Sequence, residues 1–159
     1  MRPHTPLPHP FDEGAFTLAA ARRAGVGTGR LRGRDLERPF RGVRSAPITA
    51  VRELALAYAE RMPPDHAFAG RTAARLWGLP LAQEWTREEP LDVARPARSN
   101  RARSKGIREL AVDSGRLGRV VPDGLLVLDP PSTALTLARE LSHEHLVQVM
   151  DALLTPAKR

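Results

Sequence analysis

Cysteine is absent from this sequence, and its absence excludes disulfide scaffolds, cysteine zinc sites and thiol nucleophiles. No apolar run approaches the ~20 residues that cross a bilayer, and the short run at residues 125–128 fits a buried strand. The amino-terminal residues contain no apolar core that could serve as a secretory signal. We therefore expect a cytoplasmic protein with no membrane partner.

Lysine is also scarce, so the net charge of +7 comes almost entirely from arginine, which is unevenly distributed. Between Arg22 and Arg44 the chain has eight arginines and two acids, whereas between Glu109 and Asp151 it has seven acids and three arginines. Clustered positive charge favours a polyanionic partner, although arginine enrichment also follows from a genome rich in G·C codons. The two ends of the chain are therefore expected to face different partners.

The amino-terminal part carries the helix and turn signals of a small module. Residues 1–14 are rich in proline and are expected to form a mobile or loosely docked arm. Thr17 suits the N-cap of a helix over residues 18–24, and Gly25 suits the left-handed residue that ends it. A second short helix is expected over residues 30–36, although Gly33 weakens it by about 1 kcal/mol. Residues 38–44 are expected to form an edge strand.

This order of helix, glycine turn, basic helix and basic strand predicts a winged helix-turn-helix over residues 15–46. On the second helix, Arg30 and Arg34 share one face and are the candidates for reading bases in a major groove, while Arg32 is assigned to phosphate. The full set of candidate DNA-binding residues is Thr28, Arg30, Arg32, Arg34, Arg38, Arg41 and Arg44, the last three in the wing. The alternative is a solvated arginine-rich surface without a nucleic-acid partner.

The remainder, residues 47–159, is expected to be a small α/β domain that ends in two helices. Apolar periodicity and capping residues predict helices over residues 51–62 and 71–77, a third that starts at Asp129 and a fourth that starts after Ser142. Strands are expected at residues 91–94, 107–112, 119–121 and 125–128, with a turn at residues 122–124, and residues 66–69 are expected to be extended. The expected fold class is therefore mixed α/β (α+β).

A second basic run contains Arg98, Arg101, Arg103 and Lys105 and no acid. It can contact a nucleic-acid backbone nonspecifically, or it can serve solubility alone. Catalytic interpretations find little support: His143 and His145 point about 200° apart on a helix, which disfavours a shared metal, and Asp129 is better explained as a cap. We expect no enzyme activity, no cofactor and no metal.

Several segments of the sequence resemble one known family. They comprise Phe16, Thr17, Leu18, Ala21, Ala24, Gly25 and Val26, then Leu31 and Arg32, then residues 39–43, 70–80, 129–138 and 151–154. The most specific is residues 70–80, which read Gly-Arg-Thr-Ala-Ala-Arg-Leu-Trp-Gly-Leu-Pro. Together these segments resemble actinobacterial proteins related to AbiEi, the antitoxin of a type IV toxin–antitoxin system.

The resemblance implies a DNA-binding regulator that represses its own promoter, with an α/β part that opposes a nucleotidyltransferase toxin. Such regulators are expected to bind an inverted repeat as a homodimer. Many relatives continue into an endonuclease domain similar to very short patch repair nucleases, which is not expected in this chain. The chain also departs from the family where the proline-rich arm replaces a helix, and where Gly42-Val43-Arg44 replaces the Gly-Val-Tyr that often ends the wing.

Two other classes of function stay open at this point. The first is a protein-interaction module, either toxin-neutralising or a truncated remnant, whose acidic carboxy-terminal helices bind a basic partner such as a neighbouring-gene product. The second is a nuclease fragment, which would show Mg²⁺-dependent cleavage.

Overall fold

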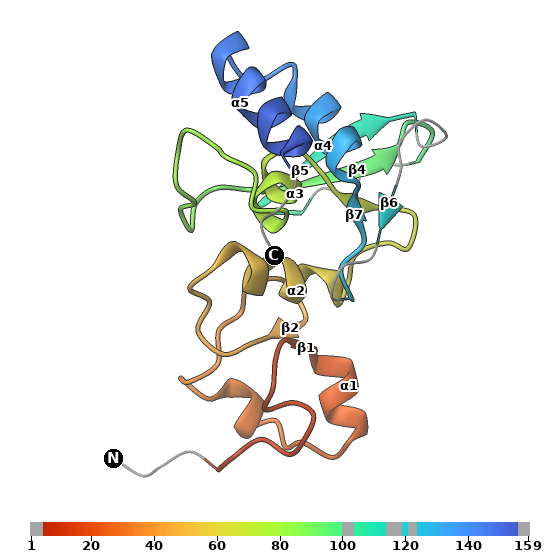
Figure 1. Ribbon diagram of the computed structural model, residues 1–159. Helices are drawn as coiled ribbons and strands as arrows, with labels where there is room; N and C mark the ends of the chain where they lie inside the picture. The colour runs from red at the N-terminus through yellow and green to blue at the C-terminus, as the bar shows by residue number, and fades with distance from the viewer. Residues whose placement is uncertain (1–4, 100–103, 114–118, 121–123, 156–159) are drawn as a thin grey trace. The chain divides into compact units, whose positions relative to one another are not determined.

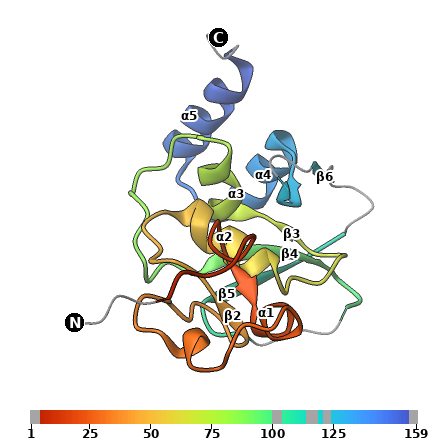
Figure 2. The ribbon, with the colours of Figure 1, turned by 90° about the horizontal axis from the view of Figure 1, so that it is seen from below.

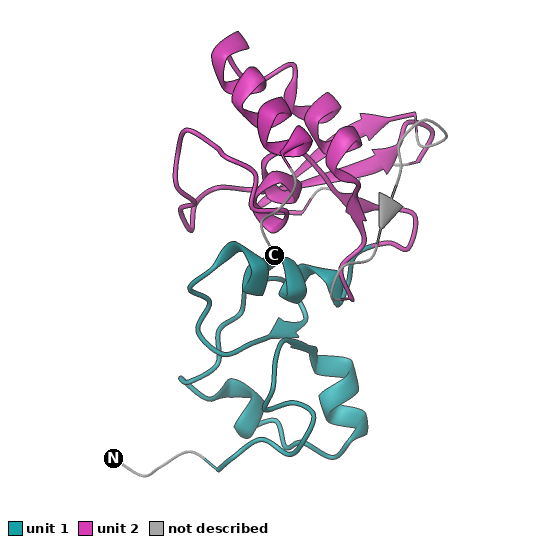
Figure 3. Ribbon diagram, in the orientation of Figure 1, with its two compact units in different colours: residues 1–62 teal, residues 63–159 magenta. Residues whose placement is uncertain are grey.

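Helices and strands both occur along the chain, which confirms the predicted mixed α/β class. The structure, a computed structural model, describes residues 5–99, 104–113, 119–120 and 124–155. The chain divides into Met1–Met62 (unit 1) and Pro63–Arg159 (unit 2), shown in teal and magenta in Figure 3. Unit 1 therefore extends past residue 47, where we expected the second domain to begin. None of the described helices is both long enough and apolar enough to cross a bilayer.

Unit 1 contains β1 (Phe16–Thr17), α1 (Leu18–Arg23), the 3₁₀ turn η1 (Arg30–Arg32), β2 (Val43–Arg44) and α2 (Val51–Ala59) (Figure 1). The predicted first helix is confirmed, because the Thr17 hydroxyl accepts a hydrogen bond of 3.1 Å from the Ala20 N–H and Gly25 has a φ of 82°. β1 and β2 pair antiparallel, with Phe16 opposite Arg44. This two-stranded ribbon joins the start of α1 to the end of the basic segment.

The predicted second helix over residues 30–36 is wrong, because only the three residues of η1 are helical. Gly33 follows η1 with a ψ of 144°, which ends the turn, and the chain then brings Asp35 back to Arg30. The Arg30 guanidinium donates to both Asp35 carboxylate oxygens, at 3.1 and 2.7 Å. A Cβ atom at Gly33 would overlap the Asp35 carboxylate, so a residue with a side chain would disturb this pair.

The strand expected over residues 38–44 is also shorter than predicted. Val43 donates its N–H to the Phe40 carbonyl at 3.1 Å and Gly42 has a φ of 82°, so a turn occupies the residues before β2. An isolated bridge between Glu37 and Ser45 extends the pairing beside β2. The wing of the predicted module is thus a turn followed by a two-residue strand.

Part of the proline-rich arm packs onto the core of unit 1. The core consists of Phe16, Ala21, Val26 and Leu31, and the partly buried residues packed against it are Leu7, Phe11, Leu18 and Leu36. The rings of Phe11 and Phe16 meet edge to face with centroids 5.2 Å apart. The arm therefore supplies apolar cover on a small core.

Replacing Phe11 by alanine is expected to destabilise unit 1 by about 2 kcal/mol, because the substitution removes a ring from the small core and from the edge-to-face pair with Phe16. Chemical unfolding of the full chain, followed by circular dichroism, measures this change. The exposed Leu56 gives a matched control, since Leu56→Ala is expected to cost less than about 0.5 kcal/mol. Equal effects of the two substitutions would show that the arm does not stabilise unit 1.

Unit 2 is built on a five-stranded sheet in the order β5-β4-β3-β7-β6. Its strands are β3 (Ala67–Phe68), β4 (Leu91–Pro96), β5 (Ile107–Val112), β6 (Arg119–Val120) and β7 (Val127–Leu128). The β4–β5 and β3–β7 pairs are parallel, and the β3–β4 and β6–β7 pairs are antiparallel. The four predicted strands are confirmed within about two residues at each end, and β3 lies in the segment predicted to be extended. The turn predicted at residues 122–124 lies largely outside the described residues.

Three helices lie on one side of this sheet: α3 (Gly70–Leu76), α4 (Pro130–Leu137) and α5 (His143–Leu154) (Figures 1 and 2). The predicted caps of the last two are confirmed, since Asp129 accepts from the Ser132 N–H at 2.8 Å and Ser142 accepts from the His145 N–H at 3.4 Å. A buried cluster of Ala74, Ala134, Leu137 and Val149 joins the three helices. The apolar residues predicted to line α4 and α5 therefore pack only partly within unit 2, because Leu137 and Val149 are buried whereas Met150 is 45% exposed.

Candidate nucleic-acid interface

Six arginines of unit 1 expose their side chains and form the group that we call the arginine cluster. Arg22 and Arg23 stand in the last turn of α1, and Arg32 belongs to η1. The other three stand in the turns that lead to β2. The complete cluster is Arg22, Arg23, Arg32, Arg34, Arg38 and Arg41. Thr28, also exposed, stands in the glycine-rich turn between α1 and η1.

The acids of the same segment are engaged elsewhere. Asp35 pairs with Arg30, and Glu37 accepts a hydrogen bond of 3.2 Å from the Ile48 N–H. Within the described part of the chain, no carboxylate pairs with any of the six guanidinium groups of the cluster. The positive charge of the cluster is therefore available to an anionic partner.

Arg30 does not have the position that the sequence predicts for a base-reading residue. Its side chain is 15% exposed and makes both hydrogen bonds to Asp35. The same pair borders a hollow that is lined by Leu7 and Phe11 of the arm. The prediction that Arg30 and Arg34 share one helix face is wrong, because Gly33 ends the turn between them.

Arg44, a predicted wing residue, points inward. It is 9% exposed, and its guanidinium donates to the carbonyl oxygens of Leu31 at 3.0 Å and Val43 at 2.8 Å. Burial, followed by the positive charges of Arg38 and Arg22, lowers the pKa of Arg44. Arg44 therefore holds η1 against β2.

Replacing Arg44 by methionine is expected to lower the stability of unit 1 by about 1 kcal/mol, because the buried carbonyl of Leu31 loses its donor. If the arginine cluster binds DNA, the dependence of that binding on salt is expected to stay unchanged, since Arg44 is turned away from solvent. Unfolding and DNA titrations on the same variant measure both quantities. A plot of the logarithm of the binding constant against the logarithm of salt gives a slope. A decrease of about 1 in its magnitude would instead show that Arg44 contacts a phosphate.

The second basic run is only partly described. Arg98 and Lys105 are exposed at its two ends, while Arg101 and Arg103 lie outside the described residues. Arg98 and Lys105 belong to unit 2, whereas the arginine cluster belongs to unit 1.

A buried acid of unit 2 escaped the sequence analysis. Asp92, which is 1% exposed, accepts hydrogen bonds from the Arg108 guanidinium at 2.7 Å and from the Arg71 N–H at 2.8 Å. Arg108 also donates to Glu140 at 2.9 Å. The hydrogen bond to Asp92, which outweighs partial burial, raises the pKa of Arg108. The sequence offered one signal for this site, because Asp92 stands between the apolar residues Leu91 and Val93 of a buried strand. The hydrogen bonds that Asp92 accepts from Arg108 and Arg71 indicate a structural role.

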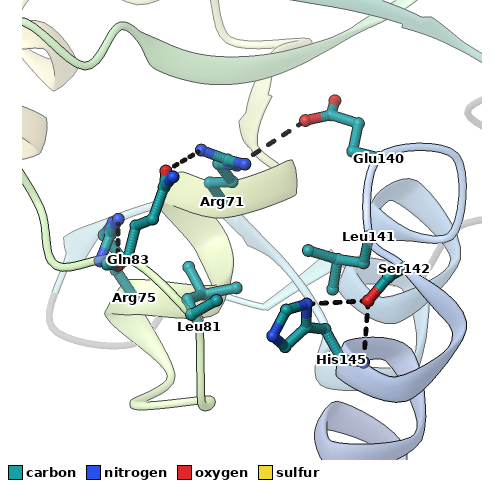
Figure 4. Close-up of a pocket in the computed structure, with 9 residues that line it drawn as sticks. Arg71, Arg75, Leu81, Gln83, Glu140, Leu141, Ser142 and His145 are labelled. Atoms are coloured by element: carbon teal, nitrogen blue, oxygen red, sulfur yellow. Dashed lines mark hydrogen bonds and ion pairs between the residues drawn. The ribbon is translucent and has the colours of Figure 1, made fainter.

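A hollow of about 150 Å³ in unit 2 lies between α3, the loop after it and the start of α5 (Figure 4). Arg71 lies between Gln83 and Glu140 (Figure 4). Its Nη1 is 3.5 Å from Gln83 Oε1, and its Nε is 3.9 Å from Glu140 Oε2. On the other wall, Ser142 Oγ and His145 Nδ1 are 2.9 Å apart. These contacts link neighbouring elements along the walls of the hollow.

The sequence matches no protein-family model and no curated protein. The arginine cluster, which combines exposure, charge and the absence of a described carboxylate partner, is therefore the candidate site from which a function is inferred.

Proposed function

We propose that the protein binds double-stranded DNA through the arginine cluster and acts as a transcriptional regulator or antitoxin-like protein. The observation that carries this proposal is the set of six exposed guanidinium groups between Arg22 and Arg41 that have no carboxylate partner among the described residues. All six belong to the short stretch of unit 1 that runs from the last turn of α1 to the turn before β2.

Arginine suits this role because its guanidinium stays charged and can donate two parallel hydrogen bonds to a phosphate. Each phosphate that is neutralised releases condensed counterions, so the binding constant falls as salt rises. If the six arginines of the cluster each contact one phosphate, the logarithm of the binding constant should fall with the logarithm of salt with a slope near −5.

The biological setting that we propose follows from the resemblance to AbiEi-related antitoxins. In that setting the protein represses its own promoter as a homodimer, and unit 2 opposes a nucleotidyltransferase toxin or another neighbouring-gene product. The reading frame next to the gene tests this part of the proposal. A nucleotidyltransferase there would support an antitoxin, and its absence would favour a regulator without a toxin.

DNA binding itself is tested by titrating the full chain against a labelled duplex from the region upstream of its own gene, at several salt concentrations. We expect measurable binding whose slope is near −5. The exposed Arg139 of unit 2 provides a matched control, because Arg139→Gln removes one charge outside the cluster and should leave the slope unchanged. Binding that does not change with salt would overturn the proposal.

A second candidate function, a protein-interaction module, is favoured by one face of α5. Val147, Met150 and Leu154 are 44, 45 and 79% exposed and recur at a spacing that places them on one side of the helix. Copurification of a neighbouring-gene product, combined with no retardation of DNA, would favour this candidate over the first.

A further inference from the structure

We infer that the arginine cluster follows the phosphate backbone of the duplex and does not read its base sequence. This inference rests on the proposed DNA binding and specifies how that binding takes place. It concerns the contact made by unit 1.

The first argument is that no described helix carries arginines of the cluster on successive turns, as a helix that reads a groove would. A recognition helix reads successive bases from successive turns. η1 has three residues, which corresponds to about 6 Å, and α1 has six residues, which corresponds to about 9 Å. α1 contributes to the cluster only through Arg22 and Arg23, which stand in its last turn. Four of the six arginines therefore come from turns and from the three-residue η1.

The second argument concerns how firmly each guanidinium is held. Reading guanine requires a planar fork in a fixed orientation, whereas a phosphate accepts a charge from many directions. Arg30 has a carboxylate that fixes its fork, but both oxygens of Asp35 occupy its donors and Leu7 and Phe11 of the arm lie beside it. Arg44 is fixed as well, but it is buried. Arg30 and Arg44 are therefore engaged within unit 1, and the six exposed arginines of the cluster have no described carboxylate to orient them.

The third argument is the composition of unit 1. Residues 1–62 contain no asparagine and no glutamine, the side chains that read adenine through two hydrogen bonds. The acids within the basic segment, which could accept from cytosine, are engaged with Arg30 and with the Ile48 N–H. Apart from arginine itself, the basic segment of unit 1 therefore offers a duplex no amide and no unengaged carboxylate that could discriminate base pairs.

Selection of the full chain against a library of duplexes with a randomised core tests the inference. We expect the same sequences to be enriched by the wild-type chain and by a variant in which Arg34, Arg38 and Arg41 are replaced by lysine, because the inference assigns no base contact to the cluster. A motif that the wild-type chain binds about 100-fold more tightly than a scrambled duplex, and that the variant no longer prefers, would overturn the inference and leave the proposed DNA binding intact. Failure to bind any duplex in the library would overturn the proposed function itself.

A conservative variant gives an independent readout. Replacing Arg34, Arg38 and Arg41 together by lysine keeps the three charges but removes the planar fork. We expect the affinity to stay within about threefold and the salt slope to stay the same, because a phosphate accepts lysine as a point charge. A loss of about tenfold or more per residue on one duplex sequence, with no loss on a scrambled duplex and with the slope unchanged, would show that the forks read bases. The exposure of all three side chains makes these substitutions compatible with folding.

Discussion

Replacing Arg22, Arg34, Arg38 and Arg41 together by glutamine is expected to reduce the salt slope of DNA binding from about −5 to about −2. The expectation follows because two exposed arginines of the cluster, Arg23 and Arg32, remain to contact phosphate. Glutamine keeps most of the length and polarity of the side chain, so the change isolates charge. Fluorescence anisotropy titrations of the full chain at several salt concentrations give the slope directly.

The four substituted side chains are exposed, so unit 1 should keep its stability within about 0.5 kcal/mol for each substitution. Arg139→Gln serves as the control for a general effect of net charge. A slope that stays near −5 in the fourfold variant would remove the cluster as the DNA site, and Arg98 and Lys105 of unit 2 would then be the first residues to test.

The sequence predicted those elements whose signals are local. Thr17, Asp129 and Ser142 each bond a backbone N–H three residues ahead, so the side chain that starts the helix and the group that it satisfies lie in one short window. The strands of unit 2 followed equally well from short apolar runs. Local hydrogen bonds and periodicity therefore suffice for most element positions in this chain.

The prediction of a base-reading helix was wrong because the structure of this segment depends on contacts between residues that lie further apart in the sequence. Arg30 bonds Asp35 beyond Gly33, and Arg44 bonds the Leu31 carbonyl thirteen residues earlier. A regular helix through Gly33 would have separated Arg30 from Asp35 by more than one turn. Helix propensity alone does not decide between a regular helix over residues 30–36 and the ion pair of Arg30 with Asp35. For the same reason, the sequence could not predict which arginines are exposed.

The segment at residues 70–80, which carries the most specific resemblance, has a structural explanation. Arg75 pairs with Glu89 at 2.8 Å, and the Trp77 indole donates to the Leu128 carbonyl at 2.8 Å. Thr72 accepts a hydrogen bond of 2.8 Å from the Asp92 N–H. These side chains join α3 to the sheet and to the loop that follows it. A motif can therefore be distinctive because it assembles a scaffold, with no contact to a ligand.

Replacing Gly70 by alanine is expected to destabilise unit 2 by about 3 kcal/mol or more. Gly70 has a φ of 50°, a conformation that costs an L-residue with a side chain about 1 kcal/mol. In addition, a Cβ atom there would lie 2.5 Å from Asp92 Oδ2 and 3.1 Å from Asp92 Cβ. Asp92 cannot move aside cheaply, because Arg108 and the Arg71 N–H both hold its carboxylate. The overlap therefore adds to the backbone strain.

Gly78 separates these two contributions, because it has a φ of 68° but no atom within 4 Å of the position that a Cβ would take. Gly78→Ala should therefore carry the backbone strain alone, about 1 kcal/mol. Chemical unfolding of both variants, followed through the signal of unit 2, gives the difference of about 2 kcal/mol that we assign to the crowding at Asp92. Equal losses would show that Asp92 yields to the new methyl group, and that its ion pair with Arg108 does not fix the start of α3.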